Sequence, residues 1–359
     1  ARASVVSHGI LYAEVPRFYA EVERAREPAL ADRPVVVGGD PRKRGLVQSA
    51  TRDALEDGVE AGMEMLEALQ RCPHARGLRT NMRRYREAAT ALRSCLRRVV
   101  PRLEASGLAA AFLDPERSED PLCVLAGRLR ESVEKELGLP LRVGIAPVKF
   151  VARLAAEEAG PEAIREVEGD ELAAFLRLLP VDRLPGVGPR TASTLAELGA
   201  RHIGELAGLD RKTLEGKLGN HGLAILEAAR GRGESTVRAS RHPRSLSLES
   251  TLNEPERDLV LLGEQLTGLA QRLSESLGLD ALGARRVAVK IRYDDQETTT
   301  RSQTLARAIA TAGEIDEVAQ DLLRRTEAGD RPVRLLGVSL SSITRSERDE
   351  AQLSLFDAT

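Results

Sequence analysis

Cysteine is scarce in this chain of 359 residues, and Cys72, Cys95 and Cys123 lie far apart in the sequence. They form no CxxC pair and no spacing typical of a metal site. We therefore expect reduced thiols in small core positions rather than disulfides. No apolar run approaches the roughly 20 residues of a membrane span, and no signal peptide is visible. These absences predict a cytoplasmic protein without a membrane partner.

The chain also lacks an excess of positive charge. Its 53 Lys and Arg residues face 55 Asp and Glu residues, which gives a formal net charge of −2. A strong nucleic-acid binder is usually basic overall. Any contact with DNA must then come from local basic patches.

The first half of the chain alternates between apolar β-type runs and helical patterns. We expect strands at 9–13, 33–39, 45–49, 103–114 and 141–145, and helices starting just after Pro16 and at 51–57, 63–71, 82–100, 122–137 and 149–159. This order predicts a sheet covered by helices. Residues 103–114 read as one buried strand, with Ala109, Ala110 and Ala111 at its centre.

The second half changes character twice. Residues 171–229 predict short helices joined by glycine turns, and 231–243 form a polar, basic link typical of a tether. Residues 245–343 then predict the order βαββαβ, which is a complete small α+β domain. The fold class is therefore α+β with several domains.

The sequence L-P-G-V-G at 184–188 lies between two short helical patterns. It is typical of a helix-hairpin-helix unit, in which Gly186 and Gly188 let the backbone approach a DNA phosphate. Arg190 and Thr191 would add contacts that fix position without reading bases. The alternative is an ordinary turn between helices.

The strand pair of the last domain is locally basic. Period-2 alternation places Arg286, Lys290 and Arg292 on one face, and Arg301 and Arg307 lie on the next strand. Such a face can follow a DNA backbone. The alternative is a solvated outer face.

The end of the sequence carries apolar residues on a polar segment. Gln352, Leu353, Leu355 and Phe356 follow a charged spacer at 345–350. Exposed side chains of this kind are typical of anchors that become ordered in a partner's pocket. The alternative is a tail packed on its own domain. QLSLF also resembles the peptide with which bacterial DNA polymerases hold the sliding clamp.

Together these features resemble the Y-family (DinB, or DNA polymerase IV-like) translesion DNA polymerases. The segments 27–39, 142–146 and 149–156 resemble parts of the palm and fingers, L-P-G-V-G resembles the thumb, and βαββαβ resembles the little finger. The resemblance implies a right-hand polymerase fold. The implied boundaries are 1–26 and 78–168 for the palm, 27–77 for the fingers, 169–231 for the thumb, 232–243 for the linker, 244–344 for the little finger and 345–359 for the tail.

The resemblance also implies two magnesium ions, held by an aspartate after the first strand and by an Asp-Glu pair. In this sequence the first position is Glu14, and the pair falls on Ala109 and Ala110. Tyr19 is kept at the position that senses the sugar. The remaining departures are Pro16 at a second acidic position and Arg52, Leu55 and Gly160 at triphosphate-binding positions.

These departures favour a pseudoenzyme without intact catalytic residues, metal or cofactor, similar to the ImuB proteins. We expect an adaptor in translesion synthesis and DNA repair that binds primer-template DNA and the sliding clamp beside a separate error-prone polymerase. One alternative is an active but unusual polymerase that uses Glu14 and Mg²⁺. The other is a clamp-binding interaction protein that does not bind DNA.

Overall fold

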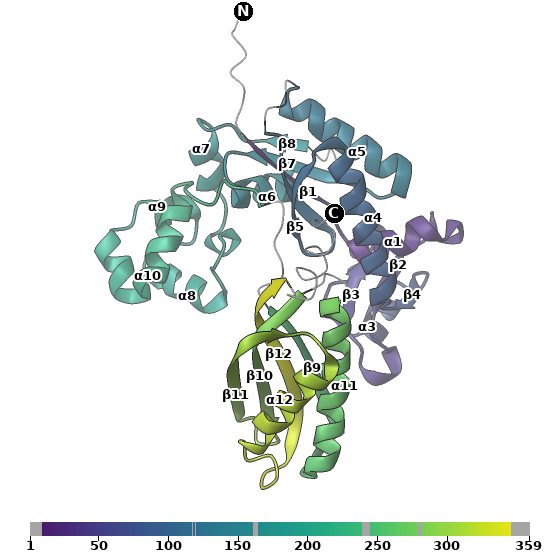
Figure 1. The fold of residues 1–359 in the computed structure, drawn as a ribbon. Coiled ribbons are helices and arrows are strands. Elements are labelled where there is room, and N and C mark those ends of the chain that lie inside the picture. Colours follow the sequence, from purple (N-terminus) through teal and green to yellow (C-terminus); the bar gives the residue numbers. More distant parts are fainter. Residues whose placement is uncertain are drawn as a thin grey trace, which may run out of the picture. The chain divides into compact units, whose positions relative to one another are not determined.

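The computed structural model describes residues 9–116, 118, 120–160, 164–238, 245–278 and 282–345. Its internal contacts divide the chain into two compact units, 1–240 and 241–359 (Figure 1). The predicted clamp anchors Gln352, Leu353, Leu355 and Phe356 lie outside the described residues. Within the described part, no helix combines the length and apolar character that crossing a membrane requires.

A five-stranded sheet in the order β5-β6-β1-β7-β8 forms the centre of the first unit. Its strands are β1 Ile10–Glu14, β5 Arg102–Ser106, β6 Ala110–Asp114, β7 Arg142–Ala146 and β8 Ile164–Glu166. Side chains alternate between the two faces because each strand has a period of two. One face packs on α4 Met82–Val99 and α5 Leu122–Leu137, and the other packs on α6 Lys149–Glu158.

A small three-stranded sheet, β3-β2-β4, builds the segment predicted as fingers. Its elements are β2 Val35–Gly38, β3 Val47–Ala50, β4 Arg76–Arg79, α2 Arg52–Glu56 and α3 Met65–Arg71. Valines of β2 and β3 and the apolar residues of α2 and α3 form its core. The helix α1 Phe18–Arg26 joins it to β1.

The segment predicted as thumb consists of helices. They are α7 Leu172–Arg177, α8 Pro189–Glu197, α9 Ile203–Ala207 and α10 Arg211–Ala229. A non-helical glycine, Gly219, interrupts α10 with φ 61° and ψ −148°. The apolar side chains of these helices pack in one cluster with those of α6.

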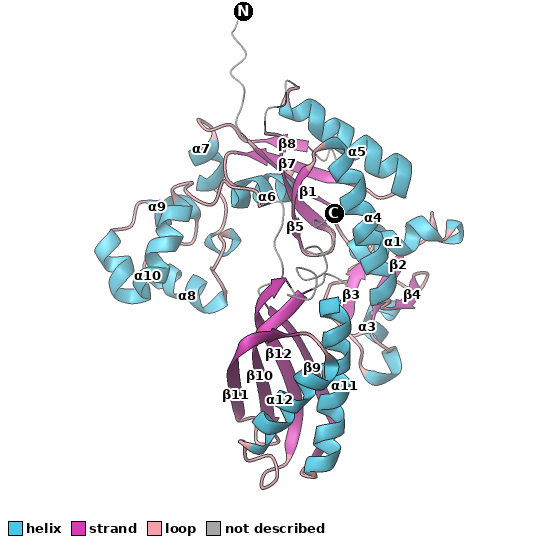
Figure 2. Ribbon diagram, in the orientation of Figure 1, coloured by secondary structure: helices cyan, strands magenta, loops and turns pink. Residues whose placement is uncertain are grey.

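The second unit is a four-stranded antiparallel sheet in the order β11-β10-β12-β9, with two helices over one face (Figure 2). Its elements are β9 Ser245–Glu256, α11 Leu259–Gly278, β10 Leu282–Tyr293, β11 Thr298–Ile309, α12 Ala312–Arg324 and β12 Val333–Arg345. The predicted order βαββαβ is therefore confirmed.

The short strands β4 and β8 are not among the elements expected from the sequence, and two further details differ from that expectation. Residues 103–114 are not one strand but the hairpin β5–β6, because Gly107 takes a left-handed conformation with φ +72° and reverses the chain. In the predicted tether, Val237 is fully buried and its carbonyl accepts a hydrogen bond of 3.0 Å from Arg102. The described start of the link is thus anchored to the first unit.

Candidate active site

One row of side chains crosses the central sheet at the end of β1. Arg142, Glu14, Ala110 and Ser106 are successive cross-strand partners on β7, β1, β6 and β5. Directly paired residues point to the same face. The register therefore brings together the predicted positions Glu14 and Ala110, and adds Arg142, which the sequence did not single out.

Arg142 neutralises the carboxylate of Glu14. Its Nε and Nη2 atoms both donate to Glu14 Oε2, at 2.9 and 2.6 Å. Both side chains are about three-quarters buried, at 22% and 25% exposure, so this charge-assisted pair is well shielded from water. The one carboxylate in the row thus already has a cationic partner.

The residues present do not fit the two-magnesium site that the resemblance implies. Ala110 offers a methyl group beside Glu14, and the carbonyl of Ala109 already accepts from Val15 N at 2.9 Å. The nearby acidic residues are also paired: Asp114, at the far end of β6, lies 3.7 Å from Arg102, and Glu104 lies 2.6 Å from Lys149.

A second row lies deeper under α6 and contains Gly144, Tyr12 and Phe112. A Cβ atom on Gly144 would lie 1.9 Å from the carbonyl oxygen of Ala152, so only glycine permits this close helix. The rings of Tyr12 and Phe112 are in contact, with centroids 4.9 Å apart. Burial, followed by the negative charge of Glu14, raises the pKa of Tyr12 to about 12, so its phenol is neutral at physiological pH.

A cavity of about 480 Å³ opens beside the first row. Three of the predicted positions, Pro16, Arg52 and Gly160, line it, whereas Leu55 does not. Its ionisable lining residues are Arg17, Arg52, Arg130, Arg142, Glu134 and Glu157. The lining holds four guanidinium groups and two carboxylates, but Arg17, Arg52 and Arg142 already pair with Glu21, Glu56 and Glu14 outside it. An anion would therefore bind here in competition with these pairs.

Arg17 is held in an unusual backbone conformation at the mouth of this cavity. Its φ of 52° and ψ of 38° are left-handed, which costs a non-glycine residue on the order of 1 kcal/mol or more. The hydroxyl of Ser49 donates to the Arg17 carbonyl at 3.0 Å and accepts from Ala20 N at 3.2 Å. Ser49 therefore fixes this turn between β1 and α1.

Tyr19 on α1 is held by an aromatic stack. Its ring lies 4.3 Å from that of Tyr85, with only 13° between the ring planes. Tyr85 is fully buried and donates its hydroxyl hydrogen to Glu23 at 2.9 Å. Burial raises the pKa of Tyr85, which keeps it neutral as a fixed support for Tyr19.

The predicted thumb residues surround the start of α8. Gly186 occupies the turn with φ +85°, and Gly188 is the residue before the first turn of the helix. Arg190 and Thr191 lie in that first turn, and the side chain of Arg190 is exposed. The local geometry is that of a glycine turn leading into a helix N-terminus.

The second unit brings only part of the predicted basic set together. Arg286, Lys290 and Arg292 share a face of β10, but Lys290 is paired with Glu249 at 2.9 Å. Arg301 lies on the opposite face, because its cross-strand partner is the buried Val289 and its Nε donates to the Arg325 carbonyl. The register therefore separates Arg301 from the others.

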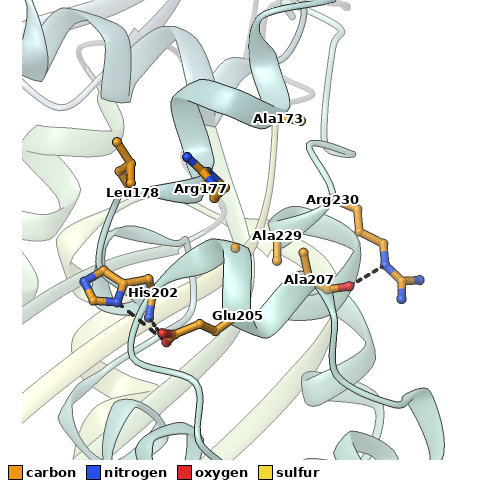
Figure 3. A pocket seen from close by; sticks show the side chains of 9 residues that line it. Ala173, Arg177, Leu178, His202, Glu205, Ala207, Ala229 and Arg230 are labelled. Atoms are coloured by element: carbon orange, nitrogen blue, oxygen red, sulfur yellow. Dashed lines mark hydrogen bonds and ion pairs between the residues drawn. The ribbon is translucent and has the colours of Figure 1, made fainter.

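A larger cavity of about 760 Å³ lies in the segment predicted as thumb, between α7, α9 and the end of α10 (Figure 3). Figure 3 shows His202 beside Glu205, with Nδ1 and Oε2 3.6 Å apart, and Arg230 donating to the Ala207 carbonyl. None of the residues predicted from the sequence lines it.

Two family models match the chain. The model described as "impB/mucB/samB family" matches residues 14–157, and the model described as "impB/mucB/samB family C-terminal domain" matches residues 243–355. The DNA polymerase IV of Halorhodospira halophila is 34% identical over 95% of this chain and 97% of its own length. The DNA polymerase IV of Methanoculleus marisnigri is 34% identical over 97% of this chain and 98% of its own length.

Solved structures share the fold. A Y-family DNA polymerase chimera of Dbh and Dpo4 is 24% identical, with a TM-score of 0.81 over 93% of this chain and 99% of its own. The insertion ternary complex of Dbh DNA polymerase is 23% identical, with a TM-score of 0.73 over 93% of this chain and 98% of its own. The predicted α+β multidomain fold is confirmed.

The prediction that the chain is not an enzyme is wrong. Relatives that are 34% identical along almost the whole chain are named DNA polymerase IV, which points to an enzyme. That prediction weighed the missing carboxylates and the changed triphosphate-binding positions. It took no account of the arginine-lined cavity, because Arg17, Arg52, Arg130 and Arg142 are brought together only by the fold.

Proposed function

We propose that the chain acts on primer-template DNA as a DNA-directed polymerase with an unusual active site. The chain belongs to the DinB-like Y-family DNA polymerases, and the proposal rests on this membership. The observation that carries this proposal is the whole-length relationship to proteins named DNA polymerase IV. A role in translesion synthesis and DNA repair follows from the same relationship.

The arginine-lined cavity supports nucleotide binding. A triphosphate carries several negative charges, and guanidinium groups bind phosphate oxygens in forked, charge-assisted pairs. To hold it beside the row of Glu14 and Ala110, Arg17, Arg52 and Arg142 would exchange their present carboxylate partners for phosphate oxygens. Fixed cations at a transferring phosphoryl group also stabilise the charge that develops in the transition state.

The same geometry predicts a slow enzyme. The row contains one carboxylate, Glu14, and its charge is already neutralised by Arg142. The metal ions that such carboxylates hold are each worth several kcal/mol in the transition state. At about 1.4 kcal/mol per tenfold in rate, we expect turnover several orders of magnitude below that of a polymerase with a complete set.

Two surfaces support contact with the DNA backbone. The turn at Gly186 and Gly188 presents backbone N–H groups at the start of α8, beside the exposed Arg190. On the second unit, Arg286 and Arg292 share a face of β10. Both surfaces suit phosphates rather than base edges, so we propose binding that depends on DNA shape and charge.

Primer extension under single-turnover conditions, with protein in excess over primer-template DNA and with Mg²⁺ or Mn²⁺ present, tests the polymerase proposal. We expect slow incorporation of the nucleotide that matches the template. Tyr19→Ala should increase ribonucleotide use, because Tyr19 occupies the position that resembles a sugar gate and is rigidly stacked on Tyr85. A contaminating polymerase would not change its sugar preference with this variant.

Two outcomes would contradict the proposal. Absence of product above a mock purification, with DNA binding intact, would refute polymerase activity. Phosphate contacts weaken as salt rises, so a chain that shows no salt-sensitive DNA binding would favour the alternative of a clamp-binding protein without DNA contacts.

We also propose that Gln352, Leu353, Leu355 and Phe356 bind the sliding clamp. Support comes from the sequence QLSLF, which resembles the clamp-binding peptide of bacterial polymerases. Leu355→Ala with Phe356→Ala should reduce clamp affinity by 2 kcal/mol or more, about 30-fold, because apolar anchors dominate such interfaces. Surface plasmon resonance on immobilised clamp measures this, with Ser354→Ala as the control, and unchanged affinity in the double variant would refute the assignment.

A further inference from the structure

Three different metal-binding side chains meet in the fingers segment, away from the cavity beside Glu14. Asp57 follows the end of α2, and Cys72 and His74 follow the end of α3. Cys72 Sγ lies 3.0 Å from Asp57 Oδ2 and 3.9 Å from His74 Nε2. His74 Nε2 lies 3.3 Å from Asp57 Oδ2.

These separations are close to the edges of a coordination tetrahedron. Zinc binds sulfur at about 2.3 Å and nitrogen or oxygen at about 2.0–2.2 Å, so tetrahedral ligand atoms lie about 3.3–3.6 Å apart. Of the three observed separations, 3.3 Å lies at the lower end of that range, 3.0 Å lies below it and 3.9 Å lies above it. One ion can therefore reach all three atoms after shifts of a few tenths of an ångström.

The backbone around the three side chains is fixed by hydrogen bonds from arginines. Arg71 Nη1 donates to the Gly58 carbonyl at 2.8 Å, which ties the end of α3 to the turn beside Asp57. Arg33 Nε donates to the His74 carbonyl at 2.8 Å. The ligands thus lie on a preorganised frame rather than on a free loop.

The exposure of the three residues suits entry of an ion. Cys72 is fully buried, whereas the side chains of Asp57 and His74 are 39% and 66% exposed. A fourth coordination position therefore faces water. A thiolate and a carboxylate together balance the charge of a divalent ion, and the thiol proton of Cys72 is released to solvent on binding.

We propose that Asp57, Cys72 and His74 bind one zinc-class divalent ion, which clips the end of α2 to the end of α3. Sulfur and imidazole ligands favour zinc over magnesium or calcium, which prefer oxygen. The site does not depend on the proposed polymerase function, because none of the three residues lines the cavity beside Glu14.

Calorimetric titration of the tag-free full chain with Zn²⁺, in reduced and metal-stripped form, tests the site. We expect one ion per chain with micromolar affinity or better. Co²⁺ should give the charge-transfer absorption of a cobalt–thiolate bond. Cys72→Ser should abolish that band and weaken Zn²⁺ binding by more than about 100-fold, since loss of a merely supporting group already costs up to that factor.

His74→Asn provides a second test that is safe for folding, because its side chain is largely exposed. This variant should weaken Zn²⁺ binding at least tenfold, because removing even a group that supports a ligand usually costs about tenfold or more in metal affinity. Cys123→Ser and His202→Asn are matched controls, since Cys123 is exposed on another helix and His202 pairs with a carboxylate without a thiol nearby. Failure to bind one ion, or binding that both site variants leave unchanged, would overturn the proposal.

Discussion

Replacing Ala109 with Asp and Ala110 with Glu is expected to raise the rate of primer extension by about two to four orders of magnitude. Ala110 is the cross-strand partner of Glu14, and Ala109 precedes it where β6 begins. The double variant therefore places one carboxylate directly across from Glu14 and a second at the start of β6, at the two positions where the resemblance implies metal ligands. Single-turnover extension in Mg²⁺, with the native chain measured in parallel, gives the ratio of rates.

The gain should depend on position and not on charge alone. Ser106 lies in the same row, but on β5, one strand beyond Ala110 as seen from Glu14. Neighbouring strands are about 4.8 Å apart, so Ser106 is that much further from Glu14 than Ala110 is. Ser106→Asp is therefore a matched control for which we expect no gain. A double variant that folds, binds DNA and extends no faster than the native chain would show that this row is not the reaction centre.

The sequence alone singled out Glu14 and Ala110, because each lies within a segment that resembles the family, and the register of β1 and β6 makes them cross-strand partners. Their role, like that of Tyr19, stays a prediction. The sequence could not reveal the Glu14–Arg142 pair, since those residues are 128 positions apart and meet only through the antiparallel register of β1 and β7. Arg17 precedes α1 and Arg130 lies in α5, so only the packing of these elements places both in the lining of one cavity.

Local signals also have limits that physical chemistry explains. The hairpin at Gly107 was missed because an apolar, alanine-rich run has the same pattern whether it is one strand or two. Cys72 was interpreted as an ordinary core residue, because no CxxC pair surrounds it. His74 lies only two positions away, but Asp57 became visible as a third possible ligand only where the ends of α2 and α3 meet.

Lys149→Met is expected to lower the free energy of unfolding by about 3–5 kcal/mol. Lys149 and Glu104 are 6% and 7% exposed, and their charged atoms lie 2.6 Å apart at the start of α6. Glu104 also accepts a hydrogen bond of 2.7 Å from the backbone N–H of Arg238, which anchors the link. Removing the ammonium takes the Lys149 charge away from this buried carboxylate and from Glu234, 3.5 Å away. Urea unfolding monitored by circular dichroism measures the loss.

A double variant distinguishes two contributions to the lost free energy of unfolding: removal of the cation beside the buried Glu104 carboxylate, and loss of the packing that Lys149 provides. Glu104→Gln with Lys149→Met removes both charges and keeps an oxygen that can accept from Arg238 N. We expect it to recover most of the stability, because replacing both members of a buried pair costs far less than removing one. Arg52→Met, which breaks the solvent-exposed pair with Glu56, is the surface control and should change stability little. A double variant as unstable as Lys149→Met alone would show that the side chain of Lys149 stabilises the sheet by packing on Phe112 rather than by neutralising Glu104.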